Sequence, residues 1–217
     1  MKRAGTKVEN LRVAHGWRLL SPRGFPAATI REFLRPAVRA VPPSLAARLG
    51  TCRISLTDRM ENGDGTELSS RWVQSGGELA VVLATGSADG HELAIEVLLC
   101  LGEALWETAG PGERQAYWNL LAAEIETGVP GEIDEDALRE KRLLLSSRIS
   151  ARSRRRFERY SQASFAGTVA EYIHCLWHEV TLRTGPEHLP APWLRRRLEM
   201  LARWFPPGRG YRLFPRN

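Results

Sequence analysis

Two histidines and one glutamate have the residue types and spacing of a metal-binding site shared by two helices. His174 and His178 lie four residues apart in a segment with helical periodicity, so their side chains face the same way. Glu96 and Glu103 lie on one face of an earlier segment with the same periodicity. If these faces meet, two imidazoles and one carboxylate could bind a divalent transition metal. Glu103, His174 and His178 are therefore the candidate set for a metal-dependent hydrolase.

A structural interpretation of the same histidines is simpler. Both flank Trp177, and the opposite face of their segment carries the apolar residues of a protein core, Phe165, Val169, Tyr172, Leu176 and Val180. Histidine pairs at helical spacing are common, and a short motif remains a hypothesis until its structural context is known. We therefore expect no cofactor and no metal, and we keep the metalloenzyme as an alternative.

Arginine dominates the basic residues of this 217-residue chain, whose formal net charge is +6. Clustered arginines can neutralise the phosphates of a nucleic acid, but a basic face without a recognised nucleic-acid motif is a weak signal. A solvated face that is ion-paired with acidic residues is the alternative that we favour, so we expect no nucleic-acid partner. The residues that would serve such binding are Arg154, Arg155, Arg156, Arg195, Arg196 and Arg197.

Residues 78–107 read as a buried strand, a short loop and a long amphipathic helix. This arrangement resembles the metal-binding half of the zincin-like metallopeptidases, in which a strand borders the substrate cleft. The following helix of those enzymes carries two zinc-binding histidines four residues apart and a glutamate that polarises the zinc-bound water. The resemblance implies a zincin-like fold with strand 78–85 at the edge of its sheet.

The residues that would perform peptidase chemistry are replaced in this sequence. The run Leu99-Cys100-Leu101-Gly102-Glu103-Ala104-Leu105 corresponds to His-Glu-Leu-Gly-His-Ala-Leu in that family. Leu99 and Glu103 stand at the two zinc-ligand positions, and Cys100 stands at the position of the catalytic glutamate. The resemblance therefore implies a degenerate site that lacks peptidase activity.

A second segment carries the same resemblance. Residues 164–172 are similar to the downstream helix from which some zincins donate a third ligand, in a Phe-Ala-Glu sequence. Gly167 stands at the position of that ligand, so all three presumed ligands are missing. The function implied is a peptide- or protein-binding module, with a partner that pairs with the sheet edge beside strand 78–85.

The elements that position these residues form an α+β domain. Alternating apolar residues predict a strand around residues 52–56, and further strands are expected at 68–74 and 78–85, giving a small antiparallel or mixed sheet of about three strands. Asp89 and Glu92 form a capping-box pattern at the start of the helix 91–107. The other predicted helices cover 27–40, 112–127, 134–147, 164–184 and a final segment that starts near Pro190.

Three regions follow from this interpretation. Residues 1–25 are expected to form a basic irregular arm, residues 26–205 a single zincin-like domain, and residues 206–217 a basic tail. No run is apolar enough for a transmembrane helix, and the start of the chain lacks a signal-peptide pattern. We therefore expect a cytoplasmic protein without membrane contacts, and the oligomeric state stays open.

Overall fold

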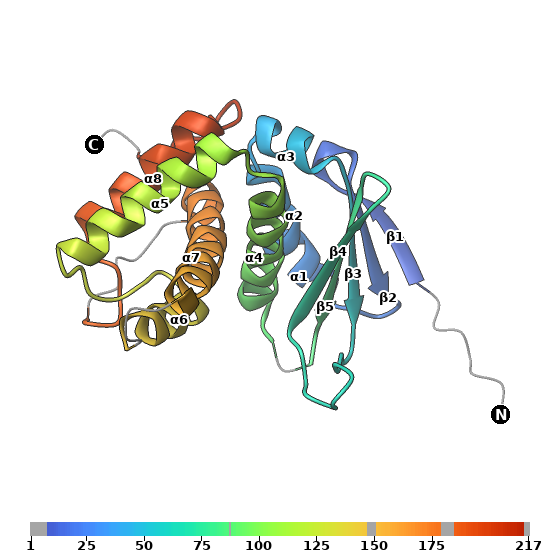
Figure 1. Ribbon diagram of the computed structural model, residues 1–217. Coiled ribbons are helices and arrows are strands. Elements are labelled where there is room, and N and C mark those ends of the chain that lie inside the picture. The colour runs from blue at the N-terminus through green and yellow to red at the C-terminus, as the bar shows by residue number, and fades with distance from the viewer. Residues whose placement is uncertain (1–7, 87, 147–150, 179–184, 215–217) are drawn as a thin grey trace.

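The protein folds as an α+β domain in which a mixed sheet carries helices on one face (Figure 1). The computed structural model describes residues 8–86, 88–146, 151–178 and 185–214, with side chains in the third range from Arg154 onward. Within these ranges, no helix is both long and apolar enough to cross a membrane.

The sheet has five strands in the order β1-β2-β3-β5-β4. The β1–β2 and β4–β5 pairs are antiparallel, and the β2–β3 and β3–β5 pairs are parallel. The strands are β1 (Val8–Arg12), β2 (Arg18–Pro22), β3 (Thr51–Thr57), β4 (Ser70–Ser75) and β5 (Glu78–Ala84).

The three strands expected from the sequence correspond to β3, β4 and β5, but the expected number of strands was wrong. The two additional strands, β1 and β2, lie in residues 1–25, which were expected to be an irregular arm. Strand β2 buries Leu19 and Ser21 against the helices and pairs with β3. A buried serine conceals the apolar alternation, and pairing with a distant segment leaves no local signal.

The expected place of strand 78–85 at the sheet edge was also wrong. Strand β5 lies between β3 and β4, and β4 is the edge strand of the described sheet on this side. Gly76 and Gly77 both have positive φ, the conformation of a two-residue hairpin turn, so β4 folds back antiparallel onto β5.

The helices occupy most of the remaining chain. They are α1 (Ala27–Thr29), a π-helical turn (Ile30–Leu34), α2 (Arg35–Ala40), α3 (Pro43–Leu49), α4 (Gly90–Thr108), α5 (Pro111–Glu126), α6 (Glu135–Leu145), α7 (Ala151–Trp177) and α8 (Ala191–Trp204). Helix α7 starts earlier than the expected position 164, because the arginine-rich segment before it is helical as well. The expected continuation of that helix through residues 179–184 lies outside the described residues.

Helix α4 is the centre of the fold and lies between the sheet and α7 (Figure 1). It begins with the predicted capping box, in which Asp89 accepts a hydrogen bond from the Glu92 amide and Glu92 accepts one from the Asp89 amide. Residues on several sides of α4 are buried, including Leu98, Leu101 and Leu105. A helix that is apolar nearly all round needs cover on opposite faces, which the sheet and α7 provide.

Candidate functional site

A cleft of about 700 Å³ lies where the edge strand β4 meets α4, α6 and α7. Three residues of the run that resembles the zincin motif, Leu99, Cys100 and Glu103, line it. Ala166, next to Gly167 on α7, lines it as well. The two segments that carry the zincin resemblance therefore meet at one cavity.

Two glutamates of α4 hold the edge strand in place. The indole Nε1 of Trp72 donates a hydrogen bond of 2.6 Å to Oε2 of Glu103, and the hydroxyl of Ser70 donates one of 2.6 Å to Oε2 of Glu96. Burial raises the pKa of Glu103, and the hydrogen bond from Trp72 opposes this rise. Glu103 is thus a structural acceptor as well as part of the cleft wall.

The cleft wall is acidic although the chain as a whole is basic. Seven carboxylic acids and three arginines line the cavity, so its field favours a positively charged occupant. The acids are Glu67, Glu96, Glu103, Asp134, Glu135, Asp136 and Glu140, and the arginines are Arg71, Arg139 and Arg159.

Asp134 packs against the position that the resemblance assigns to a third zinc ligand. A Cβ atom on Gly167 would lie 2.9 Å from the Cβ of Asp134, so the glycine allows the start of α6 to approach α7. Asp134 caps α6 by accepting hydrogen bonds from the amides of Asp136 and Ala137. Burial raises the pKa of Asp134, while these amides oppose the rise. Sequence reasoning missed Asp134 as a site residue, because its cap pattern indicates only a helix start.

Cys100, which the resemblance places at the position of the catalytic glutamate, is not activated as a nucleophile. Burial raises the pKa of its thiol to about 12, and the nearby carboxylates of Glu103 and Glu96 contribute to the rise. A thiol with such a pKa is protonated at neutral pH, and the thiolate is the reactive form. The Cys100 thiol therefore lines the cleft as a neutral group.

The metal set Glu103, His174 and His178 is not brought together. Helices α4 and α7 pack so that Gly102 faces Ala166, while His174, eight residues further along α7, meets His91 at the start of α4. Eight helical residues span about 12 Å, so Glu103 is separated from both histidines. No group of three metal-binding side chains among the described residues is placed to hold an ion.

The histidines instead form a three-imidazole cluster that sequence reasoning missed. Nε2 of His91 and Nε2 of His174 are 3.0 Å apart. The rings of His174 and His178 stack with centroids 5.2 Å apart, and Trp177 lies against them. His91 comes from a segment far away in the chain, so spacing alone could not place it here.

The arginines of the two clusters are not all exposed, although the sequence suggested a solvated basic face. Arg197 is fully buried between Glu124 and Glu132 and is removed from the candidate nucleic-acid surface. The other two arginines of its cluster are exposed, and each lies over an aromatic ring: Arg195 over Phe214 and Arg196 over Trp193. In the earlier cluster Arg154 and Arg155 are exposed, whereas Arg156 is partly buried and donates to the carbonyl of Leu143.

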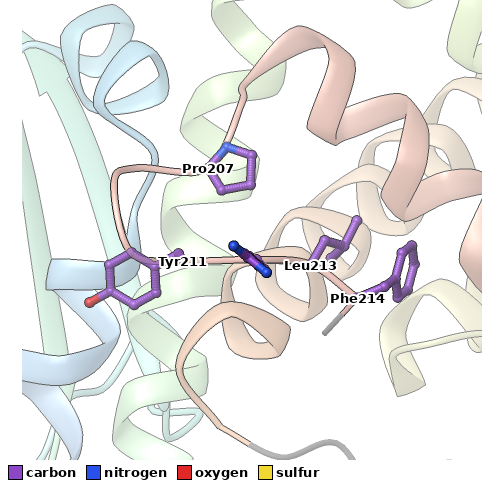
Figure 2. A pocket seen from close by; sticks show the side chains of 5 residues that line it. Pro207, Tyr211, Leu213 and Phe214 are labelled. Carbon is purple, nitrogen blue, oxygen red and sulfur yellow. The ribbon is translucent and has the colours of Figure 1, made fainter. Parts of the chain in front are cut away.

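A smaller cavity of about 510 Å³ lies along the C-terminal segment (Figure 2). It is lined by Pro207, Tyr211, Arg212, Leu213 and Phe214. These residues come from a single loop after α8, and they include neither a carboxylate nor a nucleophilic thiol. We therefore place the candidate site in the acidic cleft.

Comparison with known proteins adds no assignment. No protein-family model matches the chain, and no curated protein matches it.

Proposed function

We propose that the protein is a catalytically silent, zincin-like module that binds an extended polypeptide along strand β4, with basic side chains of that polypeptide in the acidic cleft. The observation that supports this most directly is the position of the cleft against the edge strand. An unpaired strand edge provides main-chain hydrogen bonds to an added strand, and an adjoining pocket selects side chains.

The pairing of β4 with β5 identifies the main-chain groups that a partner would use. The amide of Ala84 donates to the carbonyl of Ser69 at 2.8 Å. In an antiparallel pair, bonded and non-bonded positions alternate. The amides and carbonyls of Ser70, Trp72 and Gln74 therefore face the free edge, where no described residue pairs with them as a strand. An added strand would bond to these three positions.

Charge decides the chemistry of the partner. The carboxylates of the cleft exceed the arginines by four, and Glu96 and Glu103 place their acidic groups directly beneath the edge strand. A lysine or arginine that entered from an added strand would gain charge-assisted hydrogen bonds there. We therefore expect the bound segment to combine strand-forming residues with one or more basic residues.

Replacing Gln74 with proline is expected to weaken binding of such a segment about tenfold, because one hydrogen bond is lost and the ring obstructs the approaching strand. Proline is tolerated on an edge strand where the amide faces outward, so the fold should remain intact. Peptides selected from a random display library on the unaltered protein would serve as probes. Their affinities would be measured by fluorescence anisotropy, and circular dichroism would check the fold.

Gln74→Ala is the matched control, because it keeps the amide and removes only an exposed side chain. It is expected to bind the selected peptides as the unaltered protein does. Equal affinity of Gln74→Pro and Gln74→Ala would contradict strand addition on β4. Selection of no peptides, or of peptides without basic residues, would contradict the assignment of the cleft.

The degenerate motif predicts that the protein neither retains nor uses zinc. Elemental analysis of protein purified without chelators or metal-affinity tags is expected to find less than stoichiometric zinc, iron or manganese. Incubation with zinc is expected to produce no peptidase activity, because Leu99 supplies no ligand atom and Cys100 is protonated. Stoichiometric metal that disappeared in His174→Ala/His178→Ala would instead support a metalloenzyme centred on the histidine cluster.

A further inference from the structure

Three arginines form a continuous row on the face of the sheet that points away from the helices. Arg12 of β1 is paired with Arg18 of β2, and Arg18 is paired with Arg53 of β3. Paired residues share a face of the sheet. Arg53 lies between the buried residues Cys52 and Ile54, so this face is the one opposite the helices. All three arginines are exposed.

The register brings the first two arginines as close as a sheet allows. The amide of Val13 donates to the carbonyl of Trp17 at 3.0 Å, so the next pair, Arg12 and Arg18, occupies a non-hydrogen-bonded position. Residues in such positions have Cα atoms only about 4.5 Å apart. Arg53 lies one further strand away, at a spacing of about 4.8 Å.

This row places like charges side by side without local compensation. Like charges directly opposite each other destabilise a sheet. Within the described residues, neither Arg12 nor Arg18 has an ion-pair partner. Arg53 forms an ion pair with Glu78 at 3.4 Å, and both of those side chains are 47% exposed. Packing within the fold gives no account of such an arrangement, whereas an anionic partner would.

We propose that this arginine row, Arg12, Arg18 and Arg53, binds the phosphate backbone of a nucleic acid. Arginine presents a planar set of donors that matches phosphate oxygens. The strand positions on this face of the described sheet include no aromatic residue. Protein interfaces depend on aromatic anchors, whereas nucleic-acid interfaces are polar and strongly positive. Because aromatic platforms for stacked bases are also missing from these strands, binding should be independent of base sequence.

The proposal is independent of the acidic cleft, which lies at the β4 edge and on the helical side. It also differs from the expectation drawn from the arginine clusters of the sequence. The antiparallel β1–β2 pair brings Arg12 beside Arg18. Arg53 lies far from both in the chain, and the parallel pairing of β2 with β3 makes it their neighbour.

The test measures binding of labelled oligothymidylate and of a labelled DNA duplex over a series of salt concentrations. The slope of log K against log salt reports the number of phosphates neutralised, at about 0.7 per contact for single strands and 0.9 for duplex DNA. The variant Arg12→Gln/Arg18→Gln/Arg53→Gln is expected to flatten this slope by about 2 for single strands. Its affinity in low salt is expected to fall by about tenfold or more.

Two variants control for net charge. Arg203→Gln removes one exposed positive charge from α8 and is expected to leave the slope unchanged. Glu78→Gln removes the acid that faces Arg53 and is expected to tighten binding. The triple variant should also unfold at the same temperature as the unaltered protein or at a higher one, because it relieves repulsion between paired strands.

Each of three results would overturn the proposal. The triple variant could keep the slope of the unaltered protein. Alternatively, Arg203→Gln could reduce the slope, per charge removed, as much as the triple variant does. Alternatively, polyglutamate could bind more tightly than either oligonucleotide and lose its affinity in the triple variant, which would assign the row to an acidic protein.

Discussion

Replacing Arg197 with alanine is expected to lower the free energy of unfolding by about 3–5 kcal/mol, the largest effect of any single substitution described here. The guanidinium is fully buried and links α8 to Glu124 on α5, to Glu132 in the segment before α6 and to Ser164 on α7. Its Nε and Nη2 atoms donate to the carboxylate of Glu124, and its Nη1 and Nη2 atoms donate to that of Glu132 at 2.7 and 2.9 Å. The substitution leaves both carboxylates buried without this cation. Urea unfolding followed by circular dichroism would measure the loss.

Arg195→Ala on the same helix is the matched control. Arg195 is exposed, forms a surface ion pair with Glu199 one turn later and lies over the exposed Phe214 ring, so its removal should change stability by less than about 1 kcal/mol. If both substitutions had equal effects, the buried network would not stabilise the domain in the way proposed.

The same network sets an expected pH dependence. Burial opposes ionisation of Glu132, but Arg197 and Lys141 outweigh it and hold the pKa of Glu132 below its usual value. A folded-state pKa below the unfolded-state pKa gives stability that is present at neutral pH and is lost as pH falls through the folded-state value. We therefore expect the unaltered protein to lose stability on acidification below about pH 4.3, the usual pKa of glutamate. In Arg197→Ala this acid-induced loss should shrink, because protonation then relieves a buried negative charge.

Gly102→Ala is expected to cost about 2–3 kcal/mol, the second large effect. A Cβ atom at this position would lie 2.7 Å from the Cα of Ala166 and 2.8 Å from its carbonyl oxygen. These are backbone atoms of α7, so rotation of a side chain cannot relieve the contact and the two helices must separate. Thermal and urea unfolding would show the loss, and peptide binding should weaken with it because Ala166 lines the cleft.

Gly112→Ala is the control, because it is expected to leave stability unchanged or to raise it. Gly112 lies in the first turn of α5, and its Cβ would meet no atom within 4 Å. Alanine favours the helix over glycine by up to about 1 kcal/mol, so stability should be unchanged or higher. A similar loss for Gly102→Ala and Gly112→Ala would show that packing against Ala166 is not the cause.

The sequence predicted the local elements well and their assembly poorly. The capping pattern of Asp89 and Glu92 and the alternation through Cys52, Ile54 and Leu56 depend on neighbouring residues, and both predictions are confirmed. The parallel β2–β3 pair joins segments on either side of the first helices, so no local periodicity in the sequence indicates that they pair. The short gap between the two expected strands 68–74 and 78–85 holds the turn at Gly76 and Gly77, but the strand order also depends on where β3 lies.

The candidate site shows the same division. Leu99, Cys100 and Glu103 do meet one cavity, as their spacing on one helix allows. Asp134 comes from a loop before α6, and only the glycine at position 167 reveals how closely that loop approaches α7. Arg197 was grouped with its exposed neighbours because the sequence does not distinguish three consecutive arginines. Burial distinguishes them, and it depends on Glu124 and Glu132 from elsewhere in the chain.

The enclosure of α4 between the sheet and α7 has a consequence for protein synthesis. The sheet that covers one side of α4 precedes it in the chain, whereas α7, which covers the other side, is made later. A nascent chain that ends before α7 therefore exposes the apolar surface around Leu98 and Leu105 to other chains, and such exposure promotes aggregation. We expect truncated forms that end before residue 151 to require chaperones or to precipitate. In the cell, the apolar surface of α4 is covered only after the ribosome has also released α7, which is most of the chain.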